Sequence, residues 1–127
     1  MIVTLSETAS NALLDTLAGL LDGGSIELLS DDSRRLAVLK LSDPATMEAS
    51  GGEVVFNRIS EEDAALAQGN AANARVLGAD GSEVFHCDVG DQNSDAVIQL
   101  NTTRIFRGGP VRLTSFRLSM PGGDNGG

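Results

Sequence analysis

Aromatic residues, cysteine and histidine are scarce in this chain of 127 residues. It contains no tryptophan or tyrosine, four phenylalanines, one histidine and one cysteine. Carbohydrate-binding and base-stacking surfaces depend on aromatic rings, so both kinds of surface are disfavoured. The single cysteine, Cys87, excludes an internal disulfide and suits a reducing compartment. One histidine leaves no convincing acid–base pair or catalytic triad, so we expect a protein that is not an enzyme and uses no cofactor.

Basic charge and long apolar runs are also limited. Nine Lys and Arg residues against 18 Asp and Glu residues give a formal net charge of −9. Nucleic-acid binding requires a surplus of basic side chains, so no nucleic-acid partner is expected. No run approaches the roughly 20 apolar residues of a membrane span, and the N-terminus lacks the basic head of a signal peptide. We therefore expect a soluble protein that does not associate with membranes.

The few basic residues are unevenly distributed along the chain. Residues 1–95 carry 17 acidic and 5 basic side chains, whereas residues 96–127 carry 1 acidic and 4 basic ones. The four basic residues of the second part are Arg104, Arg107, Arg112 and Arg117. This asymmetry predicts a surface complementary to another copy of the chain or to an acidic partner. The alternative is that these arginines only solvate the outer face of a sheet.

The stretch that contains these arginines, residues 100–123, is typical of two extended segments joined by a Gly-Gly-Pro turn. Its apolar residues change parity partway along the second segment. They are Val111, Leu113, Phe116, Leu118 and Met120. Alternate residues of a strand share a face, so all five can face one core only if one extra residue is inserted. We therefore predict a β-bulge at Thr114 and Ser115.

A helical pattern covers Thr4–Asp22 and is ended by Gly23 and Gly24. Thr4 and Glu7 have the spacing of a capping box, in which both side chains satisfy backbone N–H groups at the start of a helix. Five leucines recur at helical spacing and predict one apolar stripe: Leu13, Leu14, Leu17, Leu20 and Leu21. That stripe would cover a sheet edge, a neighbouring subunit or the core of the molecule itself.

Seven or eight short strands are expected after the helix, with turn residues about every ten positions. Asp80-Gly81 is a strong hairpin signal between two of them, while residues 60–69 fit either a helical turn or a loop. The expected strands are Ser25–Leu29, Leu36–Leu41, Glu53–Ile59, Ala71–Leu77, Glu83–Val89, Ala96–Leu100, Thr102–Phe106 and Pro110–Met120. The pattern predicts a mainly β fold, an antiparallel β-sandwich of jelly-roll-like or immunoglobulin-like character with one N-terminal helix. Residues 1–121 would form this single domain, and residues 122–127 a flexible Gly-rich tail.

Two groups of polar residues have the composition of a reactive or metal site. His86, Cys87 and Asp88 are adjacent, but neighbours on a strand point to opposite faces, so His86 and Cys87 should not converge on one substrate. No second His or Cys is present to complete a zinc site. Asp91 and Asp95 begin a calcium-loop spacing whose later Gly and Glu are missing. A solvated loop is expected there, with an oxygen-ligand cation site shared with Asp88 as the alternative.

Four segments together resemble a family of small proteins encoded among the virion-structure genes of tailed bacteriophages and prophages. They cover nearly the whole chain, and none contains a catalytic signature. The segments are VTLSETASNALLDTLAGLLDGGSIEL, LSDPATMEASGGEVVFNRIS, ARVLGADGSEVFHCDVG and LNTTRIFRGGPVRLTSFRLSMPGG. The resemblance implies a non-enzymatic capsid decoration, or cement, protein with a jelly-roll-like sandwich, which binds the outside of the capsid shell and stabilises contacts between capsomers.

This role implies the partners and the location of the protein. The major capsid protein would be the main partner, with self-association as a homodimer or homotrimer. The protein would be made in the bacterial host cytoplasm and reside on the capsid surface of the virion. The residues expected to contact the capsid or another partner are Arg104, Arg107, Arg112, Arg117, Met1, Ile2 and Val3, the last three as an edge strand added to a neighbour. The alternative is a tail- or fibre-associated module that recognises the host surface through residues 78–82 and 90–95.

Overall fold

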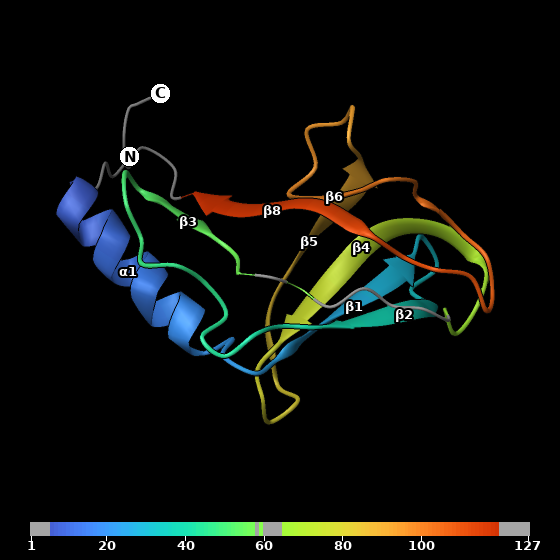
Figure 1. Cartoon of the computed structure of the whole chain (residues 1–127), viewed down its shortest axis with the longest axis horizontal. Helices are drawn as coiled ribbons and strands as arrows, with labels where there is room; N and C mark the ends of the chain where they lie inside the picture. The colour runs from blue at the N-terminus through green and yellow to red at the C-terminus, as the bar shows by residue number, and fades with distance from the viewer. Residues whose placement is uncertain (1–5, 58, 60–64, 120–127) are drawn as a thin grey trace.

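A computed structural model describes residues 6–57, 59 and 65–119, which form one helix and eight strands (Figure 1). The mainly β fold with an N-terminal helix is therefore confirmed. The elements are α1 (Glu7–Gly19), β1 (Ser25–Ser30), β2 (Arg35–Lys40), β3 (Glu53–Val55), β4 (Gly69–Leu77), β5 (Glu83–Asp91), β6 (Ile98–Leu100), β7 (Arg104–Ile105) and β8 (Leu113–Ser119). The predicted tail, residues 122–127, and the first half of the ambiguous segment 60–69 lie outside the described residues.

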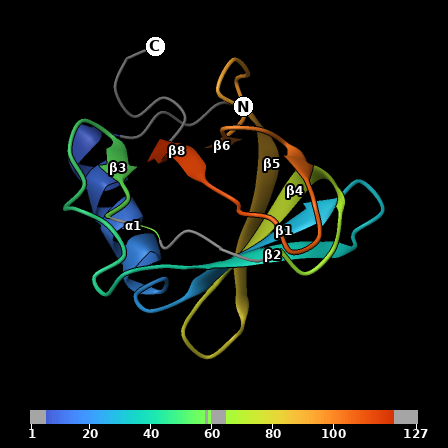
Figure 2. The same cartoon turned by 45° about the vertical axis from the view of Figure 1, so that its right-hand side comes forward.

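The strands form one open sheet that curls around its own core, as Figures 1 and 2 show. The strand order is β2-β1-β4-β5-β6-β8-β3, and β7 pairs with one end of β4. A sandwich of two separate sheets is not confirmed. The antiparallel expectation is wrong for one pair, because β5 and β6 run parallel. The short loop between them turns back over Gly90, where a Cβ atom would collide with Ser94.

The predicted bulge in β8 is confirmed. Gln99 pairs with Ser115 and Leu100 pairs with Leu113, so Thr114 is the extra residue on β8. The Thr114 hydroxyl donates a hydrogen bond of 3.0 Å to the Gln99 carbonyl oxygen, which fixes the irregular position. Because of this insertion, apolar side chains on both sides of the bulge face the interior despite their opposite parity.

Phe116 on β8 is buried in the main core. Its ring stacks on Phe56 with the centroids 3.8 Å apart, and the Phe85 ring lies tilted at 6.4 Å. Buried aliphatic residues from most of the other strands surround this group, including Ile26, Leu28, Leu36, Val76, Ile98, Leu100 and Ile105. Three of the four phenylalanines therefore have a structural role in the core.

The β4–β5 hairpin also forms as predicted. Its strands pair antiparallel, and Gly81 adopts a positive φ of 85° in the turn. The Gly81 N–H donates to the Gly78 carbonyl oxygen at 3.0 Å, which closes the turn. A residue with a side chain is strained at this φ, so the Asp-Gly pair has a conformational reason.

Helix α1 is shorter than expected and has a different N-cap. The Ser6 hydroxyl accepts a hydrogen bond of 3.1 Å from the Ala9 N–H. Thr4, predicted as the cap, lies outside the described residues. The helix ends at Gly19, three residues before the expected end at Asp22, and Leu20 is its C-cap. A turn then leads to Gly23, whose φ of 71° suits glycine.

One continuous buried stripe was predicted for the leucines of α1 and the following turn. The structure does not form this stripe. Leu14 and Leu21 are buried, whereas Leu13 and Leu20 are 49% and 58% exposed. Leu14 packs in a small second cluster with Ala49 and Val54, and Leu118 of β8 adjoins it. The helix thus covers β3 and the end of β8 with one narrow face, and a second apolar face is left at the surface.

Side chains on the helix and the turn after it hold the extended segment that leads from β2 to β3. The side-chain oxygens of Asn11, Asp15 and Asp22 accept hydrogen bonds from three backbone N–H groups of this segment. The donors are Gly52 at 2.9 Å, Ala49 at 2.8 Å and Ala45 at 2.8 Å, respectively. These side chains therefore satisfy three backbone donors of the segment, while the Met47 and Ser50 N–H groups donate to carbonyl oxygens of β3, those of Val55 and Glu53.

We predict that Leu14→Ala lowers the free energy of unfolding by about 2–5 kcal/mol, because it leaves a cavity beneath the helix. Leu13→Ala makes the same change one position away on the exposed face and should cost less than about 1 kcal/mol. Urea unfolding of both variants measures the two values. Similar losses for the two variants would contradict the burial pattern of α1.

Candidate functional site

The reactive residues of β5 face opposite sides of the sheet. The His86 side chain is 79% exposed, and its Nδ1 lies 3.5 Å from a carboxylate oxygen of Glu83. Cys87 packs against the main core instead. Burial, with a smaller contribution from the charge of Asp88, raises the pKa of the Cys87 thiol to about 12. The thiol is thus protonated near neutral pH and separated from the imidazole, which disfavours a Cys–His pair.

Carboxylates in the last part of β5 shape the backbone of the loop that follows this strand. Asp88 accepts a hydrogen bond of 2.9 Å from the Val97 N–H, and Asp91 accepts one of 2.9 Å from the Asn93 N–H. The Gln99 side chain donates to the Ser94 carbonyl oxygen at 2.8 Å. Among the residues that the structure describes, no three His, Cys, Asp or Glu side chains are grouped so as to hold a metal ion.

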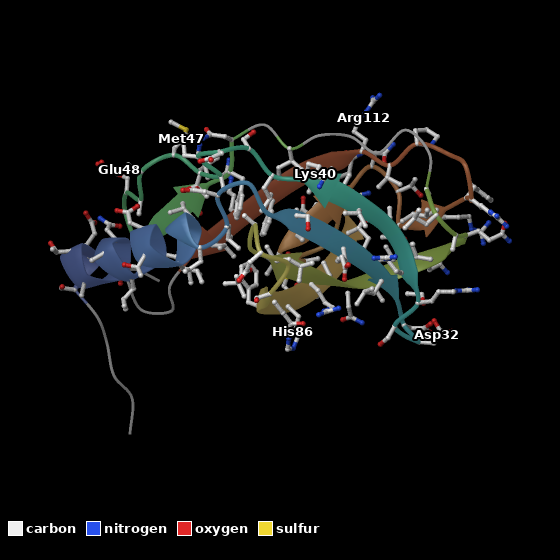
Figure 3. The ribbon with its side chains drawn as sticks, turned by 90° about the horizontal axis from the view of Figure 1, so that it is seen from below. Asp32, Lys40, Met47, Glu48, His86 and Arg112 are labelled. Atoms are coloured by element: carbon white, nitrogen blue, oxygen red, sulfur yellow. The ribbon has the colours of Figure 1, made fainter. Side chains whose placement is uncertain are left out.

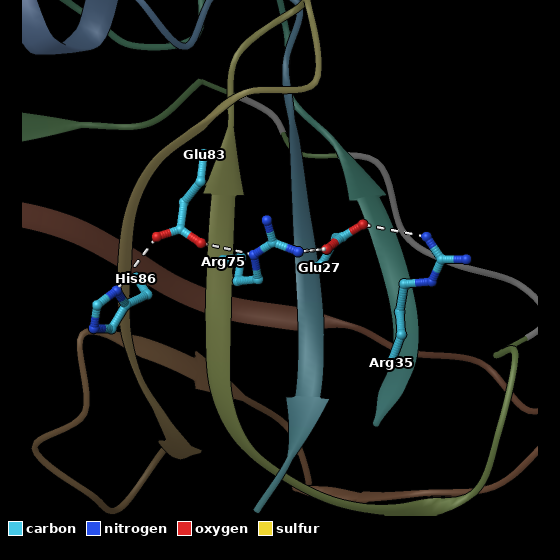
Figure 4. A network of polar contacts seen from close by, with 5 residues as sticks. All are labelled: Glu27, Arg35, Arg75, Glu83 and His86. Atoms are coloured by element: carbon cyan, nitrogen blue, oxygen red, sulfur yellow. Dashed lines mark hydrogen bonds and ion pairs between the residues drawn. The ribbon is translucent and has the colours of Figure 1, made fainter. Parts of the chain in front are cut away.

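A ladder of alternating charges crosses the outer face of β2, β1, β4 and β5 (Figure 4). Glu27 contacts Arg35 and Arg75, each at 3.2 Å, and Arg75 also contacts Glu83 at 2.7 Å. The hydrogen bond from Arg75 is the main reason that the pKa of Glu83 lies below its usual value. Each charge in the ladder has an opposite neighbour, so this face presents little net charge to a partner.

The four arginines proposed as contact residues do not form one group. Arg104 lies on β7 and Arg107 in the turn that follows it, at one end of the molecule. Arg117 lies on β8, 63% exposed and 3.9 Å from a carboxylate oxygen of Glu53. Arg112 projects from the chain just before β8 (Figure 3). The other proposed contact residues, Met1, Ile2 and Val3, lie outside the described residues.

Arg34, which sequence reasoning missed, joins Arg104 at the β7 end of β4. Both line a depression of about 390 Å³, together with Gln68, Gly69, Asn70, Ile105 and Phe106. Phe106 is 60% exposed. Within the described part of the chain, neither Arg34, Arg104 nor Arg107 forms an ion pair. We call Arg34, Arg104, Phe106 and Arg107 the arginine end.

A groove of about 650 Å³ lies between the C-terminal end of α1 and the tip of the β4–β5 hairpin. Leu17, Leu20 and Val84 contribute apolar surface to it, and the lining also includes three acidic residues and no basic one. The acidic residues are Asp22, Asp80 and Glu83, of which Glu83 is already paired with Arg75. We call this the acidic groove. The exposed leucines of the helix could have indicated it, but the sequence alone does not show which leucines the sheet covers.

We predict that Cys87 reacts slowly with iodoacetamide in the folded protein. At pH 8 its alkylation should be at least about a hundredfold slower than in the same protein unfolded in urea, because only the thiolate reacts and burial disfavours that form. Mass spectrometry of timed samples gives both rates. Comparable rates in the folded and unfolded protein would mean that the thiol is accessible and ionised.

No protein-family model, curated protein or solved structure matches this chain. Among the described residues, no helix is both long and apolar enough to cross a membrane. The arginine end combines an exposed aromatic ring with arginines, and the acidic groove combines apolar and acidic side chains.

Proposed function

We propose that this protein is a non-enzymatic structural component of a tailed-bacteriophage virion, a decoration protein that binds the outside of the capsid shell and stabilises contacts between capsomers. The resemblance of four sequence segments to a family of small virion proteins suggests this role. The structural observation that carries the proposal is the arginine end, where Arg34, Arg104 and Arg107 form no ion pair with another described residue, in a chain of net charge −9.

The residue types of the arginine end suit a protein contact. Aromatic and arginine side chains are enriched at the centres of protein interfaces, where each contributes a large contact area or several hydrogen bonds. Phe106 supplies an exposed ring, and Arg104 and Arg107 flank it in the sequence. Such a surface fits an acidic protein surface with an apolar depression, whereas the acidic remainder of the molecule disfavours adhesion to nucleic acid.

The backbone around Phe106 is well held, which favours tight binding. The Gly108 N–H donates to the Ala65 carbonyl oxygen at 2.8 Å, and the Ala65 N–H donates to the Gly109 carbonyl oxygen at 2.9 Å. Gly108 has a φ of 78°, which suits a tight turn. Because the turn is already ordered, less conformational entropy is lost when it binds a partner.

Weak contacts are sufficient for a decoration protein, because the shell repeats them many times. A protein that binds the assembled lattice better than free capsid subunits shifts the equilibrium toward the assembled state. When a protein bridges two capsomers, its first contact holds the second binding surface close to its partner at a high effective concentration. Two modest contacts therefore bind more strongly than either one alone. A small, rigid β-domain with one exposed cationic end meets these requirements without a catalytic centre.

We predict that Arg104→Glu/Arg107→Glu weakens attachment to capsids prepared from a phage that lacks this protein by at least about tenfold, since two attractive contacts become repulsive. Lys40→Glu is a matched control, because it reverses an exposed charge on β2 away from the arginine end (Figure 3). Binding is measured as the bound fraction after sedimentation of the capsids.

Arg112→Glu/Arg117→Glu extends this experiment to the other two arginines. It should weaken attachment less than Arg104→Glu/Arg107→Glu, because Arg117 already lies near Glu53 within the molecule. Equal occupancy for the wild type and Arg104→Glu/Arg107→Glu would contradict attachment through the arginine end.

A further inference from the structure

The arginine end suits an acidic protein surface with an apolar depression. We infer that this surface is the acidic groove of a second copy of the chain, so that copies associate head to tail with Phe106 of one copy in the groove of the next. This inference rests on the proposed role of the arginine end as a contact surface, and it names the partner.

The apolar parts of the two surfaces are complementary. Phe106 and Leu20, 60% and 58% exposed, are among the most exposed large apolar side chains of the described residues. A groove of about 650 Å³ with Leu17, Leu20 and Val84 in its lining has room for an aromatic ring. Placing Phe106 there would remove two exposed apolar groups from water in a single contact.

The charges of the two surfaces are also complementary. Hydrogen bonds from the backbone and hydroxyl of Ser82 hold the pKa of Asp80 below its usual value, so this carboxylate stays charged at neutral pH. The last turn of α1 carries no basic residue, and the C-terminal end of a helix has a partial negative charge that attracts cations. Arg104 and Arg107, on either side of Phe106, would meet this negative rim.

The walls of the groove are fixed relative to each other. A Cβ atom at Gly78 would lie 2.7 Å from the Leu20 carbonyl oxygen, so the base of the hairpin and the end of the helix meet through their backbones. The Gly78 N–H donates to the Ser82 carbonyl oxygen at 2.9 Å and closes the hairpin loop. The groove therefore exists before a partner binds, which reduces the cost of association.

The two surfaces lie at opposite ends of β4 and cannot meet within one copy. β7 pairs with Gly69 and Asn70 at the start of this strand, whereas the groove adjoins its end after Leu77. The nine residues of β4 separate the two by roughly 26 Å at 3.3 Å per residue. Figure 1 shows this separation, with the hairpin at the lower edge and the β7 region at the right.

In the head-to-tail arrangement each copy binds a different neighbour at either end, so the contact is heterologous and produces rings or open chains. Symmetric alternatives are disfavoured by charge. Two acidic grooves facing each other would bring carboxylates together, and two arginine ends facing each other would bring guanidinium groups together. On a capsid, head-to-tail contacts would link neighbouring copies into a connected layer, so the arginine end would strengthen attachment through the neighbouring copy rather than through the capsid protein.

Sedimentation velocity of the purified protein tests this inference in the absence of capsids. The wild type should associate as its concentration rises to about 1 mM, near the effective concentration of neighbours held on a surface, and added salt should weaken the association. Phe106→Glu blocks the arginine end and Leu20→Glu blocks the groove. Each variant alone should associate at least about tenfold more weakly than the wild type.

Mixing the two variants gives the decisive result. Each variant keeps one intact surface, so an equimolar mixture should form 1:1 dimers through the arginine end of the Leu20→Glu chain and the groove of the Phe106→Glu chain. Leu13→Glu and Met47→Glu introduce the same charge at other exposed apolar positions, 49% and 61% exposed, and should associate like the wild type. Thermal unfolding verifies that every variant is folded.

Several outcomes would overturn the inference. A wild type that stays monomeric to about 1 mM, a mixture that does not dimerise, or a control variant that loses association would each do so. Association of either blocked variant alone at wild-type strength would indicate a symmetric contact instead. If the purified protein does not self-associate but Arg104→Glu/Arg107→Glu still releases it from capsids, the acidic surface belongs to the shell, and the proposed function stands without this inference.

Discussion

The insertion of Thr114 in β8 is the constraint on which most of this structure depends. β8 pairs with β6 on one side and β3 on the other, and the bulge allows residues before and after it to face inward. Phe116 then reaches the Phe56 ring in the main core, and Leu118 adjoins the small cluster under the helix. Without the extra residue, one half of this strand would turn its apolar side chains to water, and the helix, β3 and the curled sheet would lose their common support.

Ion pairs on the sheet surface determine which charges remain for binding. Glu27, Arg75 and Glu83 neutralise one another across the outer face of neighbouring strands. Among the described residues, the arginine end lies at the start of β4 and the acidic groove beyond its other end. The two surfaces thus place unlike charges at opposite ends of one strand, in a chain whose net charge is strongly negative. Such polarity favours ordered association with a repeating protein surface over nonspecific adhesion.

Local patterns in the sequence predicted the parts of the fold that depend on neighbouring residues. The parity change before Phe116 predicted the bulge, and Asp80-Gly81 predicted the hairpin, because both are set within a few residues. Pairings between distant segments were not accessible in this way. The parallel direction of β6 and the approach of Arg34 to Arg104 depend on which strands meet. Likewise, which leucines of the helix are buried and which are exposed depends on how much of α1 the sheet covers.

The central claim is that this protein decorates a phage shell, and counting its copies in purified virions tests that claim most directly. Quantitative mass spectrometry gives the molar ratio of this protein to the major capsid protein. A decoration protein occupies equivalent positions of the lattice, so we expect a ratio near one to one or a simple fraction such as about one to two. A handful of copies per particle would contradict the claim and would place the protein at the tail or the portal, as a host-recognition module.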